Sequence, residues 1–359
     1  MISNNTDSLF TIGILGSGQL GRMISIASSQ LGLRTHIFAP DAKNSPAGEI
    51  AHHTTTATYD DEIALTSFAK SVDVITSEFE NVPATVMGLL ADYCPVSPGH
   101  LALHTAQHRI REKSLALDLG ISTPKFWPIT NSSELKSAMQ NHGLPCILKK
   151  CTLGYDGKGQ VSINPDDNLD AAFESLGTRD AVLEEKVNFT AEASFLIARN
   201  TQGDICHFPS SLNKHHNGIL AQSTAPARIH EDICTEGRKA VEKLANSLEL
   251  FGLLALETFI TKDGKLLFNE IAPRPHNSFH WTIEGCATSQ FTQLARLLSG
   301  MPYGATNTYG EWRMDNLLGE DMVKLPEILL SPGIHVHIYG KKDAKTGRKM
   351  GHTNRLLNE

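Results

Sequence analysis

The stretch that most restricts what this chain can fold into is 253–281, where two apolar runs flank the polar segment 262–265. Within that segment, Asp263-Gly264 is a dipeptide typical of two-residue hairpin turns, because both turn positions require a positive φ. Counting equal steps outward from such a turn places Glu257 directly opposite Glu270 on the neighbouring strand. The sequence therefore predicts an antiparallel hairpin that carries two carboxylates on one face.

This pair of carboxylates needs a compensating positive charge. Directly opposite side chains lie roughly 4.5–5.5 Å apart at Cβ, and like charges at that spacing destabilise a sheet. The flanking residues are apolar, so the pair is not a solvated edge. Mg²⁺ is one remedy, since it is commonly held by one or two carboxylates together with substrate phosphates. The alternatives are one protonated and one ionised carboxylate, or a neighbouring Lys or Arg, and the hairpin alone leaves them open.

Length and composition indicate an ordinary globular protein of two or three domains. The chain has 359 residues, 40% of them hydrophobic and 20% charged, and this length exceeds what one hydrophobic core normally supports. Its net charge of -7 provides no general field for nucleic acid, so we expect no nucleic-acid partner. The most apolar windows fall short of the roughly 20 residues that a membrane span needs, so we expect no membrane association.

The N-terminus and the cysteines favour a cytoplasmic location. The polar start lacks the basic and apolar regions of a signal peptide. The cysteines are scattered and form no C-x-x-C pair, which argues against both a disulfide framework and a zinc site. We interpret all six as reduced thiols: Cys94, Cys146, Cys151, Cys206, Cys234 and Cys286.

In the first hundred residues, predicted strands alternate with helices. The strands 11–15, 35–38 and 72–76 are separated by helical patterns, and this order predicts a doubly wound parallel sheet. The first helix opens with the G-x-G-x-x-G motif at 16–21, and Asp41 lies near the position of a ribose-binding acid. Such a motif serves NAD, but also any ligand that approaches the backbone at a helix N-terminus, so it leaves the ligand open.

Several charged groups have plain structural interpretations when judged by pattern alone. A single amphipathic helix is predicted at 106–119, and its basic residues Arg109, Arg111 and Lys113 are interpreted as a solvated face. The adjacent histidines His215-His216 are typical of a polar loop. None of these residues is assigned a function by its pattern.

A glycine-rich loop follows the predicted strand 146–150. The segment 151–161 contains three glycines and has lysines nearby, a composition that suits folding over phosphates with backbone N–H groups turned inward. The loop lacks the G-x-x-x-x-G-K-[ST] pattern of a Walker A motif. A plain glycine-rich hairpin is equally compatible with the pattern.

Taken in order, these features resemble the ATP-grasp superfamily. The resemblance rests on Lys149 in a strand, the loop 153–160, the E-E-K-V segment 184–187, Glu192, and the hairpin with Glu257 and Asn269-Glu270. Within the superfamily, motifs over almost the whole chain are similar to those of the N5-carboxyaminoimidazole ribonucleotide synthetases. They are G-S-G-Q-L-G-R-M at 16–23, E-F-E-N-V at 78–82, L-G-Y-D-G-K-G-Q at 153–160, N-E-I-A-P-R-P-H-N-S-F-H-W at 269–281 and G-R-K-M-G-H at 347–352.

The resemblance implies a mixed α/β and α+β architecture of three parts. Residues 1–105 would form a Rossmann-like pre-ATP-grasp domain with a doubly wound parallel sheet. Residues 106–300 would form the ATP-grasp domain, with a glycine-rich lid subdomain at about 121–187, and residues 301–359 a small β-rich C-terminal module. The implied activity is a ligase reaction of purine biosynthesis, in which 5-aminoimidazole ribonucleotide is carboxylated with bicarbonate and ATP through carboxyphosphate. The implied cofactors are ATP and Mg²⁺, and the implied assembly is a homodimer.

The resemblance also implies roles for individual residues. The nucleotide would be held by Arg109, Lys149, Gly154, Tyr155, Asp156, Gly157, Lys158, Gly159, Gln160, Glu184, Glu185, Lys186, Val187, Glu192, His215, Asn269 and Glu270. Mg²⁺ would be held by Glu257 and Glu270. Bicarbonate or the carboxyphosphate made from it would be held by Arg274, His276 and Asn277, and these three would be catalytic together with Lys341 and Arg348. Aminoimidazole ribonucleotide would contact Gln19, Glu80, Tyr155, Asp156, Lys341 and Arg348, with Lys342 an alternative to Lys341.

Three other functions remain to be weighed against this one. Another ATP-grasp ligase would share the hairpin and the lid, and would differ at Arg274-Pro275-His276-Asn277 and in the basic C-terminal segment. An NAD-dependent dehydrogenase would use the N-terminal glycine motif but leave the carboxylate hairpin unexplained. A nucleotide-binding module without activity is disfavoured by the intact pair of glutamates.

Overall fold

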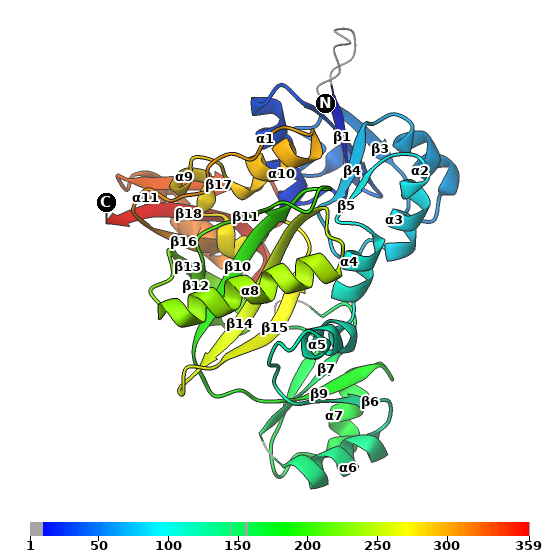
Figure 1. Cartoon of the computed structure of the whole chain (residues 1–359), viewed down its shortest axis with the longest axis vertical. Helices are drawn as coiled ribbons and strands as arrows, with labels where there is room; N and C mark the ends of the chain where they lie inside the picture. Colours follow the sequence, from blue (N-terminus) through cyan, green and yellow to red (C-terminus); the bar gives the residue numbers. More distant parts are fainter. Residues whose placement is uncertain (1–9, 144, 155–156, 359) are drawn as a thin grey trace.

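The computed structural model describes residues 10–143, 145–154 and 157–358. These residues build three sheets: a parallel sheet near the N-terminus, a small antiparallel sheet at the lower end of Figure 1, and a large antiparallel sheet that forms the body of the molecule. Across the described ranges, no helix is long and apolar enough to cross a membrane.

The N-terminal sheet confirms the predicted doubly wound arrangement. Its order is β3-β2-β1-β4-β5, and every neighbouring pair is parallel. Ile12, Ile14 and Leu15 are completely buried because helices cover both faces. The strands are β1 (Thr11–Leu15), β2 (Arg34–Ala39), β3 (His53–Thr56), β4 (Val74–Ser77) and β5 (Val96–Ser97). The helices are α1 (Gln19–Gln30), η1 (Ala42–Asn44), α2 (Glu62–Ala69) and α3 (Ala84–Ala91).

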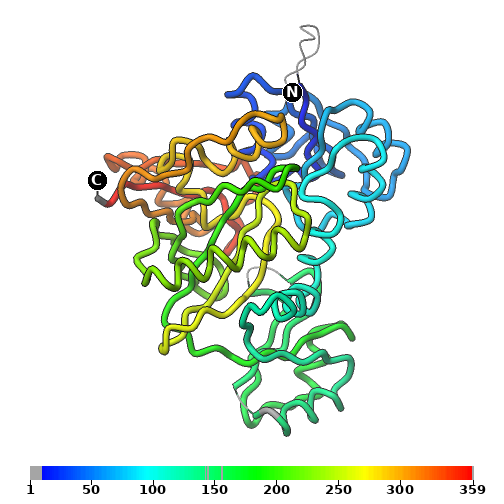
Figure 2. Tube along the Cα trace, viewed as in Figure 1, coloured from blue at the N-terminus to red at the C-terminus, as the bar shows by residue number. Residues whose placement is uncertain are grey.

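The small antiparallel sheet forms a separate lobe with its own hydrophobic core. Its strand order is β6-β9-β7-β8, and Leu135, Leu148 and Leu183 pack together beneath its two helices. The lobe lies at one end of the chain trace, below the larger sheet (Figure 2). Its elements are β6 (Phe126–Ile129), α6 (Ser132–His142), β7 (Cys146–Lys150), β8 (Gln160–Ile163), α7 (Leu169–Ser175) and β9 (Ala181–Glu185).

The large sheet has the order β15-β14-β10-β12-β13-β16-β18-β17, with β11 paired to β10. The strand-rich C-terminal segment is therefore continuous with it, through pairs such as Gln222 with Asp315. The strands are β10 (Phe189–Arg199), β11 (Ile205–His207), β12 (Ser211–His216), β13 (Ile219–Ala225), β14 (Gly252–Thr261), β15 (Leu266–Ala272), β16 (Glu311–Leu318), β17 (Ile334–Ile338) and β18 (Lys349–Asn358). The remaining helices are α4 (His100–Ala106), α5 (Arg109–Asp118), α8 (Glu231–Ser247), η2 (Asn277–Phe279), α9 (Thr282–Gly285), α10 (Gln290–Leu298), η3 (Gly319–Lys324) and α11 (Leu325–Leu329).

Helices cover both faces of the large sheet where the hairpin lies. Because side chains alternate along a strand, Leu254 of β14 packs in the core beneath α8, while its neighbour Leu253 packs in a second core shared with α10. The second core also contains Met23 and Ile24 of α1. One continuous core therefore fixes the N-terminal domain against the sheet that carries the two glutamates.

The hairpin pairs Glu257 with Glu270 as predicted, but its turn is different. Thr261 and Lys265 close a three-residue loop, in which Gly264 has φ +78 while Asp263 keeps a negative φ. A β-bulge at Asn269 then shifts the register by one residue, so Thr258 faces Phe268 while Glu257 still faces Glu270. The longer loop and the bulge offset each other.

The helix predicted at 106–119 is present as α5, but it begins at Arg109, three residues later than predicted. The chain breaks between α4 and α5 at Gln107 and His108, where the Gln107 side chain is anchored on another segment and the Arg109 N–H is bonded outside the helix. The Gln107 amide donates to the carbonyls of Glu80 and Val82 at 2.7 and 2.6 Å. The Arg109 N–H donates to the carbonyl of Cys151 at 3.0 Å. The break points the start of α5 at the end of β7.

Candidate active site

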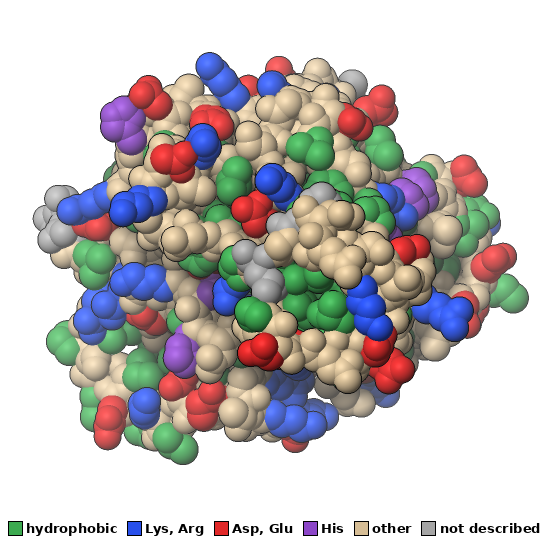
Figure 3. Space-filling model, turned by 90° about the horizontal axis from the view of Figure 1, so that it is seen from below, with side chains coloured by type: hydrophobic (Ala, Val, Ile, Leu, Met, Phe, Trp, Pro, Cys, Tyr) green, Lys and Arg blue, Asp and Glu red, His purple; other side chains and the backbone are tan. Residues whose placement is uncertain are grey.

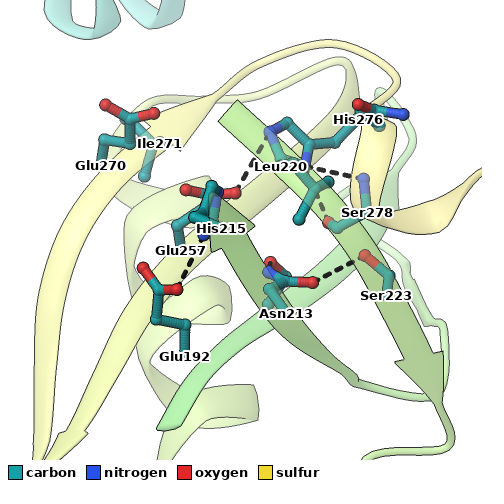
Figure 4. Close-up of polar contacts among 12 residues, drawn as sticks. Glu192, Asn213, His215, Leu220, Ser223, Glu257, Glu270, Ile271, His276 and Ser278 are labelled. Atoms are coloured by element: carbon teal, nitrogen blue, oxygen red, sulfur yellow. Dashed lines mark hydrogen bonds and ion pairs between the residues drawn. The ribbon is translucent and has the colours of Figure 1, made fainter. Parts of the chain in front are cut away.

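The paired glutamates of the hairpin lie between a cation and a histidine. Arg109 Nη1 lies 3.1 Å from Glu270 Oε2, and His276 Nε2 lies 3.4 Å from Glu257 Oε1. Glu257 is 8% exposed. Figure 4 shows the carboxylates on adjacent strands, with His276 approaching from the segment that follows the hairpin. The neighbouring arginine foreseen as an alternative to a metal is therefore present, but it reaches only one of the two carboxylates.

The two carboxylates titrate differently because of these neighbours. Burial, together with the charge of Glu270, raises the pKa of Glu257 to about 7. Burial would also raise the pKa of Glu270, but Arg109 and Lys149 outweigh it and lower that pKa below its ordinary value. Burial lowers the pKa of His276 well below its ordinary value, so His276 is neutral at physiological pH. At Glu257 the positive charges of His215 and Lys349 do not offset burial and the charge of Glu270, and a divalent cation bound between the carboxylates would supply the missing compensation.

Helix α5 is not a solvated face, contrary to the interpretation from sequence. Lys113 is 0% exposed and Glu112 is buried. The Glu112 carboxylate accepts a hydrogen bond from the Ile271 N–H at 3.1 Å, and Lys113 Nζ donates to the carbonyl of Asn269 at 3.0 Å. Both contacts are made to β15, the edge strand that carries Glu270. The charged residues of α5 thus satisfy backbone groups of the strand that bears the glutamate.

A buried ion cluster lies beside the hairpin, at the base of the small lobe. Glu184 of β9 accepts from Lys149 Nζ at 2.8 Å, and Lys113 Nζ lies 3.4 Å from the same oxygen. Burial would raise the pKa of Glu184, but the lysines and Arg109 lower it to about 2. The sequence placed Lys149 and Glu184 at the nucleotide, and the structure places them in direct contact with each other.

The rest of the E-E-K-V segment leads out of the small lobe. Glu185 and Lys186 are exposed, and their N–H groups donate to the carbonyls of Lys125 and Pro145 at 2.9 Å each. Val187 follows in the short link to β10. Backbone atoms of this segment therefore lie where the small lobe meets the large sheet.

Glu192 and His215 were predicted separately and are joined in the structure. His215 is on strand β12, not in the polar loop expected from sequence, and its Nδ1 lies 2.7 Å from Glu192 Oε2 (Figure 4). Burial would lower the pKa of His215, but the hydrogen bond to Glu192 and the charge of Glu257 raise it. His215 is therefore influenced by two carboxylates, those of Glu192 and Glu257, beside the candidate metal site.

The glycine-rich loop contacts elements on both sides of this region. The position of a Cβ on Gly157 would lie 3.2 Å from the carbonyl oxygen of Asn217, in the turn between β12 and β13. A Cβ on Gly154 would lie 3.4 Å from an Arg109 guanidinium nitrogen. Gly157, Lys158 and Gln160 are exposed, while Gly159 is half-buried and has φ +73. The expected contacts of Tyr155 and Asp156 lie outside the described residues.

The segment after the hairpin is held by other polar side chains. Arg274 was expected to face an anion, and in the structure its Nε and Nη2 donate to Glu80 Oε2 at 3.0 and 2.6 Å. Asn277 forms a reciprocal amide pair with Asn316 of β16, at 3.0 and 2.7 Å. Two of the predicted substrate and catalytic residues, Glu80 and Arg274, are therefore brought together from opposite ends of the chain.

The G-x-G-x-x-G turn does not offer its helix N-terminus to a dinucleotide. The carboxylate of Glu78 accepts from the N–H groups of Gly18 and Gly21 at 2.8 and 3.1 Å. A Cβ on Gly16 would come within 2.6 Å of the Glu78 side chain, so this glycine leaves room for the glutamate. The dehydrogenase interpretation is wrong, because the position of the pyrophosphate is filled by the protein. Gln19, a predicted substrate contact, is the first residue of α1.

The predicted C-terminal basic residues lie in the turn before β18. Lys341 Nζ donates to the carbonyl of Lys349 at 2.7 Å, and Arg348 Nη1 donates to the carbonyl of Asp343 at 3.1 Å. These bonds fold the 341–349 turn onto itself. Seen from below in Figure 3, basic, acidic and histidine side chains are interspersed over the face, so no single sign of charge dominates it.

Sequence reasoning missed four residues of this region: Glu78, Glu112, Lys113 and Asn316. All four are buried and all act on other elements far away in sequence. For Glu112 and Lys113, the only signal in the sequence was a run of charged residues that follows Arg109 in a predicted helix. Nothing local to β16 indicated Asn316.

The small and large antiparallel sheets, the loop between β7 and β8, and the acidic hairpin define an ATP-grasp enzyme. Family models match almost the whole chain: "Ribonucleotide synthetase preATP-grasp domain" at 9–107, "ATP-grasp domain" at 114–291, and "Phosphoribosylaminoimidazole carboxylase C-terminal domain" at 313–359. With the relatives described next, these matches show that the chain belongs to the N5-carboxyaminoimidazole ribonucleotide synthase family.

Curated relatives match over nearly the full chain. The N5-carboxyaminoimidazole ribonucleotide synthase of Brucella melitensis is 43% identical over 348 residues, which is 96% of each protein. The bifunctional purine synthesis protein purC/E of Dictyostelium discoideum is also 43% identical, over 95% of this chain, but the match spans only 36% of that longer protein.

Solved structures of this family superpose closely on the chain. An ADP complex of N5-carboxyaminoimidazole ribonucleotide synthetase has a TM-score of 0.94 and 38% identity, covering 98% of this chain and 94% of that one. The enzyme from Aspergillus clavatus, in complex with ADP and 5-aminoimidazole ribonucleotide, has a TM-score of 0.91 and 27% identity, covering 98% and 94%.

Proposed function

We propose that this protein carboxylates 5-aminoimidazole ribonucleotide in purine biosynthesis, consuming bicarbonate and ATP and releasing N5-carboxyaminoimidazole ribonucleotide, ADP and phosphate. The observation that carries the proposal is the convergence of the acidic pair Glu257 and Glu270 with Arg109 and, at the hairpin exit, Arg274. One hairpin thus joins residues suited to the nucleotide phosphates with residues suited to bicarbonate. The relatives are named N5-carboxyaminoimidazole ribonucleotide synthases, after the product of the proposed reaction.

The carboxylate hairpin suits Mg²⁺. Glu257 and Glu270, helped by the amide of Asn269, offer the hard oxygen ligands that this ion prefers. The raised pKa of Glu257, caused by burial beside Glu270, is the mark of a carboxylate whose charge has too little compensation. Bound there, the ion would neutralise charge on the nucleotide phosphates.

The nucleotide is assigned to the region where the small lobe meets the large sheet. Lys149 and Arg109 supply fixed positive charge for its phosphates, and the loop 154–160 covers them. The backbone after β9 binds the base, and Glu192 with His215 binds the ribose hydroxyls. Phosphoryl transfer concentrates negative charge, so positioned cations contribute more to catalysis than a protein nucleophile would.

In the first step, an oxygen of bicarbonate attacks the γ-phosphorus, the bond to the bridging oxygen breaks, and ADP leaves. We assign the resulting carboxyphosphate to Arg274, His276 and Asn277. Arg274 exchanges Glu80 for this anion, while the neutral ring of His276 donates or accepts a hydrogen bond without adding charge. Carboxyphosphate hydrolyses in water, which gives the loop over the site a protective role.

In the second step, the amine of aminoimidazole ribonucleotide attacks the activated carboxyl carbon, or CO₂ released from it, and phosphate leaves. We assign this substrate to Gln19 and Glu80 of the N-terminal domain and to Lys341 and Arg348 of the C-terminal turn, together with Tyr155 and Asp156. Binding of the substrate to Glu80 would release Arg274 from its ion pair with Glu80. The order of the two steps would then depend on this ion pair.

An ADP-release assay with each component omitted in turn tests the proposal. Full rate is expected only with Mg²⁺, ATP, bicarbonate and aminoimidazole ribonucleotide together. Undiminished turnover without bicarbonate would contradict carboxylation, and dependence on a different amine would indicate another ATP-grasp ligase. Product identity is checked by incorporation of labelled bicarbonate.

The organisation of the protein is part of the same proposal. We infer domains at 1–105, 106–300 and 301–359, a lid at about 121–187, a homodimer, and a cytoplasmic location. Light scattering measures the dimer, because a monomer of 39.1 kDa and its dimer differ twofold in mass. Limited proteolysis with and without Mg·ADP tests the lid, which we expect to be protected by the nucleotide.

A further inference from the structure

Lys113 is a fully buried lysine to which neither the sequence motifs nor the proposed chemistry assigns a role. Its side chain is 0% exposed. Removing an ammonium from water costs several kcal/mol unless other groups compensate it. The contacts of Lys113 are therefore specific, and they lie next to the groups assigned to phosphoryl transfer.

The ammonium group of Lys113 connects two separate elements. It donates to the carbonyl of Asn269 at 3.0 Å and lies 3.4 Å from Glu184 Oε2. The Phe268 ring centroid is 5.6 Å away and closes the apolar side of the pocket. Lys113 on α5 thus ties strand β9 of the small lobe to strand β15 of the hairpin.

The contact with Asn269 has a structural cause. Asn269 is the extra residue of the β-bulge, so it has no partner residue on β14, and β15 is the edge of its sheet. Its carbonyl is satisfied by Lys113, and the N–H of Ile271 is satisfied by Glu112 of the same helix. Helix α5 therefore replaces the missing neighbouring strand at the point where Glu270 is presented.

Through its contact with Glu184, Lys113 also affects a second charged group, the ammonium of Lys149. Glu184 Oε2 accepts from Lys149 at 2.8 Å while it also contacts Lys113, so two ammonium groups share one carboxylate oxygen. Without Lys113, Glu184 would be neutralised by Lys149 alone and would hold it more tightly. Less of the Lys149 charge would then be available to a phosphate.

We propose that Lys113 is a positioning residue for phosphoryl transfer: by holding Glu184 and the bulged carbonyl of Asn269, it fixes Lys149 and the Glu270 strand at a set spacing. The proposal rests on the proposed function and deepens it. It predicts that Lys113 affects nucleotide and metal handling more than the bicarbonate and aminoimidazole ribonucleotide sites, whose assigned residues lie beyond the end of β15 and on other elements.

The test compares Lys113→Met with Lys243→Met, a matched control. Lys243 also donates to a backbone carbonyl of another element, that of Leu119 at 3.1 Å, but on the exposed outer side of α8. In Lys113→Met we expect kcat per folded molecule to fall about tenfold or more, because small displacements of reacting groups are costly. The KM values for bicarbonate and aminoimidazole ribonucleotide should change less than the kcat, and Lys243→Met should behave as the wild type.

Two further measurements separate this role from a structural one and from the proposed function. Affinity for Mg·ADP alone requires no carboxylation, and we expect it to weaken in Lys113→Met. A loss of thermal stability with unchanged kcat and Mg·ADP affinity would overturn the proposal, as would equal losses in Lys243→Met. A wild-type protein that binds Mg·ADP but does not carboxylate would contradict the proposed function. The comparison of Mg·ADP affinity between wild type and Lys113→Met would still decide the role of Lys113.

A double variant tests the route through Glu184. If Lys113 acts by sharing the charge of Glu184, Lys113→Met combined with Glu184→Gln should lose no more activity than the worse single variant, because Lys149 is no longer drawn to a carboxylate. Losses that multiply would show that the two residues act independently, and would overturn this route.

Discussion

Glu257 should destabilise the metal-free protein at neutral and alkaline pH, and its replacement by Gln should therefore stabilise the fold while abolishing activity. The pKa of this carboxyl is raised from 4.5 to about 7, first by burial and then by the charge of Glu270. A folded-state pKa above the unfolded one means that the folded protein binds the proton more tightly. Stability is then complete below about pH 4.5 and is lost progressively as the pH rises through about 7.

The magnitude follows from the width of that window. At 1.36 kcal/mol for each pH unit, a pKa raised from 4.5 to about 7 corresponds to about 3 kcal/mol of lost stability above pH 8. For a chain of 359 residues, that is about 4 °C in Tm. Glu257 is only 8% exposed, so solvent screening reduces the effect little.

The assay is thermal unfolding of wild type and Glu257→Gln in chelator, from pH 4 to pH 9. We expect the two Tm values to converge at low pH and the variant to be the more stable by about 4 °C at pH 8. Glu112, whose pKa burial raises to about 8, titrates in both proteins and cancels in the difference. Adding Mg·ADP should raise the Tm of the wild type much more than that of the variant. A Glu257→Gln protein less stable than wild type at pH 8 without metal would refute the reasoning.

Three other substitutions have expected outcomes. Glu270→Gln should abolish turnover in the ADP-release assay with an unchanged circular dichroism spectrum, and near-normal activity would remove Glu270 from the metal site. Arg274→Met should raise the KM for bicarbonate at least tenfold while leaving the Kd for Mg·ADP nearly unchanged, since losing a charged partner of an anion costs about 1.5–3 kcal/mol; a larger effect on ADP would contradict its assignment. Glu78→Ala should lower stability by roughly 1–3 kcal/mol, because the N–H groups of Gly18 and Gly21 lose their acceptor, and denaturant titration measures the loss. Unaltered stability of that variant would show that water replaces the carboxylate without cost.

The N-terminal sheet could be predicted because its signals are local. Buried parallel strands are short apolar runs separated by helices, and β1, β2 and β4 fit that description. Strand β3 was missed because His53–Thr56 is largely exposed and has no apolar run. The extension of the large sheet by β16 depends on pairing across about ninety residues, which no local pattern records.

Candidate site residues could be proposed from the sequence where a motif states both a residue type and a spacing. The carboxylate pair, the glycine loop and Arg274 belong to that class. Lys113 does not, because a lysine in an ionic helix is usually solvated, and its burial follows from packing of α5 against an edge strand. Glu78 was taken only as part of a motif, and its role in filling the glycine turn appears when Gly16 is seen against it.

The hairpin shows why a correct residue pair can rest on an incorrect register. The two-residue turn assumed from Asp263-Gly264 would pair all residues in step, whereas the loop has three residues and the bulge at Asn269 restores the step. Because strict alternation would turn Asn269 away from the face of Glu270, the bulge is also what allows both residues to serve one site. The carbonyl that it leaves without a partner is the one that Lys113 binds. The bulge therefore explains at once the opposed glutamates, the adjacent amide and the buried lysine. Deletion of Asn269 separates these roles, because it should restore a simple ladder in which Glu257 still faces Glu270, while it removes the adjacent amide and the carbonyl that Lys113 binds. Unchanged metal-dependent turnover in that variant would contradict the role assigned to the bulge.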